Sequence, residues 1–216
     1  MKAVGGPGNG VFECAQDLVG YTELCLLRTD DPELYGRLFS RIGELFARIW
    51  RRFLAEFGDL YAVCRFGDDL GFKSSLLLPP DDVRKHLIPQ YARVVDLVHE
   101  AGKPFLLHSC GNIFEVMDDI IDGAGIDAKH SNEDTIARID TWIERYGGRI
   151  GVFGGIDTDV LCGPDREEIA RYVERVYGVG SSASGFAIGS GNSIPDYVPV
   201  DGYLTMVNEV RRLRGD

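Results

Sequence analysis

Short apolar segments and longer amphipathic segments alternate along most of this 216-residue chain, and the alternation limits the fold more than any other feature. An apolar run such as residues 104–107 has the length of a buried strand, and a stretch with helical periodicity follows it. Five strand–helix pairs are predicted, with strands near 60–66, 104–107, 126–130, 149–153 and 185–188. Because helices follow strands so regularly, we expect a parallel sheet in an α/β fold.

Polar and ionisable residues stand where each predicted strand ends. They are Asp68 and Asp69, His108 and Cys110, His130, Asp157, and Asn192. Parallel strands bring their carboxyl ends to one edge of a sheet, where barrels and open α/β sheets keep their active sites. Helix capping explains Ser131 and Asn132 well. It explains a cysteine, two histidines and a pair of aspartates poorly, so the pattern favours a functional site at this edge.

The sequence His-Ser-Cys-Gly-Asn at 108–112 indicates the chemistry of that site. Residues two apart in a strand point to the same face, so His108 and Cys110 are expected to project together. Imidazole nitrogen and thiolate sulfur are natural zinc donors, but zinc needs at least three protein ligands. The alternative is that Cys110 packs as a small apolar residue while His108 caps the next helix.

Five motifs together resemble the uroporphyrinogen decarboxylase superfamily. They are Gly-Asp-Asp-Leu-Gly-Phe at 67–72, His-Ser-Cys-Gly-Asn at 108–112, Gly-Ile-Asp-Ala-Lys-His-Ser at 125–131, Gly-Gly-Ile-Asp-Thr at 154–158 and Gly-Ser-Gly-Asn-Ser-Ile-Pro at 189–195. The resemblance implies a (β/α)₈ TIM-barrel type of fold with the site at its C-terminal mouth. It also implies one of two activities: porphyrinogen decarboxylation, or zinc-dependent methyl transfer that serves corrinoid proteins and thiols such as coenzyme M.

The chain departs from both branches of the superfamily. In the methyltransferase branch the His-x-Cys pair supplies two zinc ligands, and a later cysteine after the last strand supplies the third. Residues 189–192 of this chain contain no cysteine, so the third ligand stays open among Cys162, Asp68, Asp69 and Cys64. The arginine-rich N-terminal substrate segment of the decarboxylases has no counterpart here.

The number of strand–helix units indicates an incomplete barrel. A full barrel has eight units and typically about 250 residues. Five units are clear here, and residues 2–4 could end a sixth, so the chain resembles the C-terminal two-thirds of a family member. We predict one domain over 1–216, with a helical N-terminal segment at 11–58. Unpaired strand edges and an exposed barrel interior would favour a homo-oligomer.

Charge and cysteine content narrow the partners and the location. The chain has 23 Lys plus Arg against 34 Asp plus Glu, a net charge of −11, which argues against nucleic-acid and anionic-membrane partners. The sequence shows neither a signal peptide nor an apolar run of the roughly 20 residues that span a bilayer. Five cysteines indicate reduced thiols and a cytoplasmic location.

These observations predict a zinc-dependent methyltransferase-like protein that moves a methyl group between a corrinoid protein and a small thiol. His108 and Cys110 would hold the zinc, with Cys162 as a further candidate ligand. Asp68, Asp69 and Asp157 are assigned as catalytic residues, and His130 and Asn192 as substrate-binding residues. Two alternatives stay open: decarboxylation of a porphyrinogen-like acid, and a shortened paralogue that binds a partner without catalysis.

Overall fold

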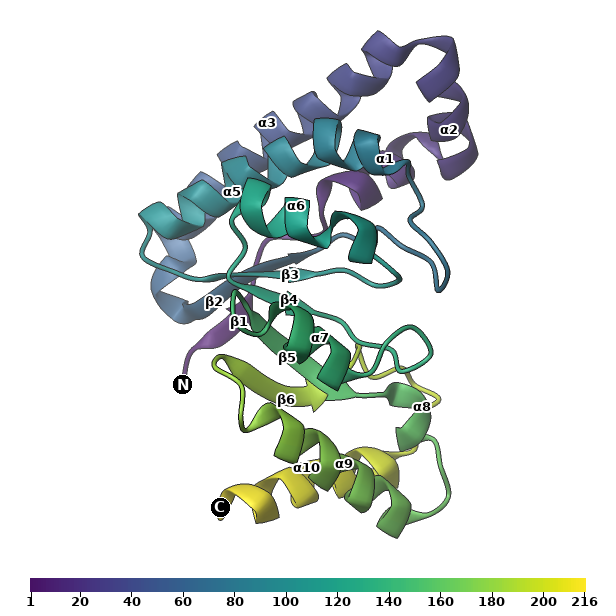
Figure 1. Ribbon diagram of the computed structural model, residues 1–216. Helices are drawn as coiled ribbons and strands as arrows, with labels where there is room; N and C mark the ends of the chain where they lie inside the picture. The colour runs from purple at the N-terminus through teal and green to yellow at the C-terminus, as the bar shows by residue number, and fades with distance from the viewer. The chain divides into compact units, whose positions relative to one another are not determined.

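The computed structural model describes residues 1–216. The chain forms two compact α/β units, Met1–Asp127 and Ala128–Asp216, which Figure 1 shows in purple to teal and in green to yellow. Each unit holds three strands that pair in parallel, in the order of the sequence. The α/β class and the parallel pairing confirm that part of the prediction.

In the first unit the strands are β1 (Ala3–Gly5), β2 (Tyr61–Gly67) and β3 (Phe105–His108). The helices are α1 (Val11–Val19), α2 (Tyr21–Asp30), α3 (Pro32–Phe57), α4 (Pro80–Asp82), α5 (Ile88–Glu100) and α6 (Phe114–Ala124), with short helical turns η1 (Gly58–Leu60) and η2 (Val83–Leu87). Helices α3 and α5 run side by side (Figure 1). The predicted helical segment at 11–58 is thus three helices, and Gly20, with a φ of 85°, separates α1 from α2.

In the second unit the strands are β4 (Ala128–His130), β5 (Gly151–Ile156) and β6 (Phe186–Ser190). The helices are α7 (Ile139–Tyr146), α8 (Thr158–Leu161), α9 (Arg166–Gly180) and α10 (Val200–Arg214). Helix α10 packs against α9, as Figure 1 also shows.

Two predicted helices are shorter or more irregular than their periodicity suggested. The amphipathic segment at 80–101, which follows the first predicted strand, is divided into α4, the π-helical turn η2 and α5. Pro89 lies at the start of α5, where its missing N–H and its ring prevent a regular α-helical turn before it. In the amphipathic segment at 133–146 the helix begins only at Ile139, because residues 134–136 form a turn.

Aromatic packing fixes the strands of the first unit against its helices. The ring of Phe105 lies 5.0 Å from that of Phe66 and 6.0 Å from that of Trp50, and Phe66 lies 5.2 Å from Tyr91. All four side chains are buried, so β2, β3, α3 and α5 share one core. No helix of the structure combines the length and the apolar character that crossing a membrane requires.

Candidate metal centre

The register of β2 and β3 brings two of the predicted motifs together. Gly67 pairs with His108, and the backbone N–H of Asp68 donates to the carbonyl of His108 at 2.9 Å. Strands β2 and β3 therefore end next to each other at the same edge of the sheet. Asp69 comes next to the loop that carries Cys110, as parallel strand ends predict.

Three metal-binding side chains meet at this point. The donor atoms of Asp69, His108 and Cys110 all lie within 4.8 Å of one another. Cys110 Sγ is 3.5 Å from His108 Nε2, and Asp69 Oδ1 is 3.7 Å from the same nitrogen. His108 is buried, whereas Asp69 and Cys110 are half-buried.

Backbone hydrogen bonds join the two loops that carry these donors. Gly71 N–H donates to the Cys110 carbonyl at 3.2 Å, and Asn112 N–H donates to the Phe72 carbonyl at 2.7 Å. Gly111 has a φ of +85°, and a Cβ there would lie 2.0 Å from the carbonyl carbon of Gly71. Only a glycine allows this close approach of two backbones. The donor positions are therefore set by the backbone rather than by mobile side chains alone.

The donor set fits zinc. In a tetrahedral site with bonds of about 2.0–2.3 Å, neighbouring donors lie roughly 3.3–3.8 Å apart. The two distances from His108 Nε2, 3.5 Å and 3.7 Å, fall in this range. Nitrogen, sulfur and a single carboxylate oxygen are ligands that zinc accepts together, and three protein ligands leave a fourth position for substrate.

Asp68 serves helix α1 rather than this cluster. Its carboxylate is fully buried and accepts hydrogen bonds from the backbone N–H groups of Phe12 (2.9 Å) and Glu13 (2.8 Å) and from the hydroxyl of Tyr91 (2.5 Å). Burial raises the pKa of Asp68 to about 6, although these donors lower it. The N-cap of α1 is Gly10, which has no side chain to accept those bonds. Asp68, which directly follows β2, caps the helix instead.

Glu13 was not identified from the sequence, although it lies beside the aspartate pair. One of its carboxylate oxygens is buried without a hydrogen-bond partner. Burial first, and then the negative charges of Asp68 and Asp69, raise the pKa of Glu13 to about 7. The pairing of β1 with β2 brings Glu13 close to the two aspartates, which lie 55 or more positions later in the chain. No local sequence signal marks it.

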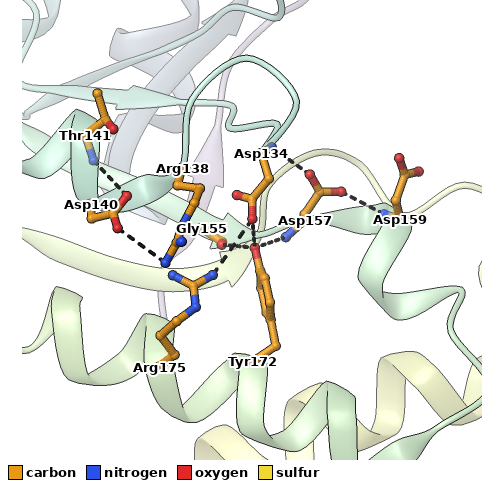
Figure 2. A network of polar contacts seen from close by, with 9 residues as sticks. All are labelled: Asp134, Arg138, Asp140, Thr141, Gly155, Asp157, Asp159, Tyr172 and Arg175. Carbon is orange, nitrogen blue, oxygen red and sulfur yellow. Dashed lines mark hydrogen bonds and ion pairs between the residues drawn. The ribbon is translucent and has the colours of Figure 1, made fainter.

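Asp157 lies in a polar network of the second unit (Figure 2). Its carboxylate accepts from the backbone N–H groups of Asp159 at 2.8 Å and Asp134 at 2.7 Å, so it caps α8 and holds the turn at Asp134. Tyr172 donates to the Asp134 carboxylate at 2.8 Å, and Arg175 lies 3.8 Å from the same oxygen. Burial and the Asp134 charge raise the pKa of Tyr172, and burial raises the pKa of Asp134.

The two predicted substrate-binding residues share the end of β6. His130 Nε2 is 3.0 Å from the carbonyl oxygen of Ser190, and the Ser190 hydroxyl donates to the carbonyl of Asn192 at 2.6 Å. Asn132, interpreted from the sequence as a cap, is buried nearby, and neither polar atom of its side chain has a partner. A Cβ at Gly154 would lie 2.8 Å from its amide oxygen.

The remaining candidate ligands lie outside the three-residue cluster. Cys162 is exposed at the C-terminal end of α8 in the second unit, with its sulfur 3.5 Å from the Thr158 carbonyl, and its role as a zinc ligand stays a prediction. Cys64 is buried in β2, and burial raises the pKa of its thiol, which suits a packing residue. Within the first unit, the carboxylate of Asp69 is the third donor.

Solved structures from two other organisms have a similar fold. A methyltransferase from Methanosarcina mazei superimposes with a TM-score of 0.76 at 17% identity, covering 99% of this chain and 59% of its own. A vitamin-B12 independent methionine synthase from Listeria monocytogenes gives a TM-score of 0.53 at 11% identity, covering 99% of this chain and 64% of its own. At these identities the likeness shows the fold alone, and this chain spans less than two thirds of either protein.

Sequence comparison assigns the family. A search of curated proteins found no significant match. The model of the uroporphyrinogen decarboxylase (URO-D) family, however, matches residues 3–213, which is nearly the whole chain. The chain therefore belongs to the uroporphyrinogen decarboxylase family.

Proposed function

We propose that this chain is a zinc-dependent, methyltransferase-like member of its family, which transfers a methyl group between a corrinoid protein and a small thiol. The observation that supports this most directly is the cluster of Asp69, His108 and Cys110, whose donor atoms lie within 4.8 Å of one another. A metal with three protein ligands keeps a position open for substrate, which is typical of catalytic zinc.

Zinc held there would keep a bound substrate thiol in its nucleophilic thiolate form near neutral pH. Residues around the cluster hold the proposed zinc ligands in place. Asp69 accepts a hydrogen bond from the Cys110 backbone at 2.9 Å, which fixes the loop that carries the thiolate ligand. Burial holds the His108 ring, and Asp68 ties α1 to the end of β2 beside the site.

We infer that the chain carries five to six of the eight strand–helix units of a full (β/α)₈ barrel. His130 and Asn192 are proposed to bind the substrate and Asp157 to support the loop after β5, where it caps α8. Five cysteines without a disulfide suit the reducing cytoplasm, where we place the protein.

Elemental analysis of the reduced protein, purified with zinc available, tests the proposal. We expect close to one zinc per chain. We expect the Cys110→Ser variant to lose at least about 10-fold in zinc affinity, because it removes the thiolate ligand. Cys162→Ser is the matched control: it removes an exposed thiol of the second unit and should leave the zinc content unchanged if the cluster of the first unit suffices. A folded wild type that binds no zinc would contradict the proposal.

The reaction is tested with methylcobalamin as the methyl donor and 2-mercaptoethanol as the acceptor, and the methyl thioether is measured by mass spectrometry. Zinc-loaded wild type should form the thioether, and Cys110→Ser should not. A metal-free protein that releases carbon dioxide from a porphyrinogen would favour decarboxylation instead. A folded protein with neither activity would favour the shortened, non-catalytic paralogue.

A further inference from the structure

Asn132, which follows β4, carries a buried carboxamide without a hydrogen-bond partner. Only 5% of the residue is exposed, and neither its amide nitrogen nor its amide oxygen is bonded to another group of the chain. An unpaired polar group costs free energy when it is buried, so a native fold keeps one mainly where a ligand or an ordered water completes its hydrogen bonds. The amide of Asn132 is therefore a candidate for binding rather than for packing.

Backbone hydrogen bonds hold Asn132 in place without help from its side chain. Its N–H donates to the Gly191 carbonyl at 2.8 Å, and the Gly191 N–H donates to the Ile156 carbonyl at 2.5 Å. A Cβ at Gly191 would lie 2.1 Å from the Asn132 carbonyl oxygen, so only a glycine allows the two loops to approach in this way. The position of the amide is thus fixed before any ligand binds.

The amide lies on the side of the sheet that faces away from the helices. A Cβ at Gly155 would lie 2.9 Å from the Val176 side chain of α9 and 3.1 Å from the Ile139 side chain of α7, so this position faces the helices. Its neighbour Gly154 faces the other side, where a Cβ would lie 2.8 Å from the Asn132 amide oxygen. In open α/β sheets, ligands bind outside the carboxyl ends of the parallel strands, and Asn132 stands at such an end.

The surroundings of the amide favour a neutral ligand group. The Ser190 carbonyl is already 3.0 Å from His130 Nε2. The Lys129 ammonium lies over the Trp142 ring of α7, 3.7 Å from its centre, and so belongs to the helix side of the sheet. A carboxamide presents an N–H donor beside a C=O acceptor, and a second carboxamide satisfies both at once. A carboxylate has acceptors alone and would leave the Asn132 oxygen facing a negative charge.

We propose that the Asn132 amide binds a carboxamide at the edge of the corrinoid, through a pair of N–H···O=C hydrogen bonds. This inference rests on the proposed function and names the part of the corrinoid that the second unit recognises. A corrin ring carries acetamide and propionamide arms around its edge, whereas a porphyrinogen carries carboxylates there. Such an arm is long enough to enter beside the half-buried His130 ring and reach the amide.

Equilibrium dialysis with methylcobalamin, together with urea unfolding, tests this role. The Asn132→Leu variant keeps nearly the same side-chain size and removes both polar atoms. It should bind methylcobalamin at least about 10-fold more weakly, while its free energy of unfolding equals or exceeds that of wild type, because the removed group is unpaired in the free protein. Asn208→Leu, at an exposed position of α10, is the matched control and should change neither quantity. A variant with lower stability and unchanged binding would show that the amide holds only a structural water, and would overturn the proposal. A wild type that binds no methylcobalamin would also overturn it.

A pair of corrinoids tests the chemistry of the contact. Dicyanocobinamide and dicyanocobyrinic acid share the corrin ring, but the second carries carboxylates in place of the carboxamides. Wild type should prefer dicyanocobinamide, and Asn132→Leu should lose most of that preference. An equal preference in wild type and variant would overturn the proposal.

The zinc content and the thioether assay separate this inference from the proposed function. Asn132→Leu should bind as much zinc as wild type, because the metal donors lie in the first unit. If zinc-loaded wild type forms the thioether and Asn132→Leu binds corrinoids normally, methyl transfer stands and the role of Asn132 is removed. If wild type binds no zinc but Asn132→Leu still weakens corrinoid binding, the zinc-dependent function fails and the corrinoid contact stands.

Discussion

The Asp69 carboxylate accepts a hydrogen bond from the backbone N–H of Cys110 at 2.9 Å, while the carboxylate of its neighbour Asp68 points away to cap α1. Two adjacent aspartates at one strand end thus have separate tasks. One lies with the zinc-type donors, and the other connects β2 to a helix that begins more than 50 residues earlier in the chain. This division can be tested by changing each carboxylate to an amide.

The Asp69→Asn substitution is expected to weaken zinc binding without unfolding the protein. The amide oxygen can still accept from Cys110 N–H, so the free energy of unfolding of the metal-free protein should change by less than about 1 kcal/mol. Loss of the negative charge should lower the zinc affinity by about 10-fold or more. Competition with a chromophoric chelator measures the affinity, and urea unfolding measures the stability. An unchanged affinity would remove Asp69 from the proposed ligand set.

The Asp68→Asn substitution is expected to lower the free energy of unfolding rather than the zinc affinity. The amide NH₂ would face donors, because Phe12, Glu13 and Tyr91 all donate to this carboxylate. Leaving buried donors unpaired should lower the free energy of unfolding by about 2–3 kcal/mol. Hydrogen exchange should show the loss of protection first in α1. If Asp68→Asn instead lowered zinc affinity at unchanged stability, Asp68 would be the ligand and our assignment of the two carboxylates would be reversed.

The Gly10→Ala substitution also tests the capping of α1 by Asp68, because Gly10 lies against the Asp68 side chain. Gly10 has a φ of −86°, which any residue adopts, so backbone strain plays no part. A Cβ at this position would lie 2.2 Å from the Cβ of Asp68 and 2.3 Å from its carboxyl carbon. The clash should lower the free energy of unfolding by about 1–3 kcal/mol. Gly148→Ala, where a Cβ would meet nothing within 4 Å, is the control and should leave stability nearly unchanged.

The sequence predicted the strand ends well because alternation of apolar and amphipathic segments is a local signal. It placed Asp69, His108 and Cys110 at neighbouring strand ends, and the register of β2 with β3 brings them together. It could not tell Asp68 from Asp69, because that choice depends on where α1 begins in space. Glu13 was not identified from the sequence for the same reason, because only the pairing of β1 with β2 brings it close to the aspartates.

The contribution of His86 to the stability of the folded protein is expected to fall at mildly acidic pH. Its ring packs edge-on against Tyr35, with centroids 5.4 Å apart, and stacks on Phe39 at 6.0 Å. Burial first, and then the charge of Lys85, lower the pKa of His86 below 6.5; Asp82 opposes this shift, and Arg28 adds to it. Folding therefore favours the neutral ring. Its contribution is fully present above pH 6.5 and is lost as the pH falls through the lowered pKa of the folded state, because the unfolded chain takes up the proton first.

Replacing His86 by a residue that does not titrate should remove this contribution to the pH dependence of stability. When the pH is lowered from about 7.5 to about 5, the free energy of unfolding measured in urea should change more favourably for His86→Phe than for wild type. His86→Gln separates titration from packing. It should show the same difference in pH dependence from wild type as His86→Phe, at lower stability throughout, because it removes the ring that Tyr35 and Phe39 contact. Equal pH dependence in wild type and both variants would mean that the packing of η2 against α3 does not disfavour the charged form of His86.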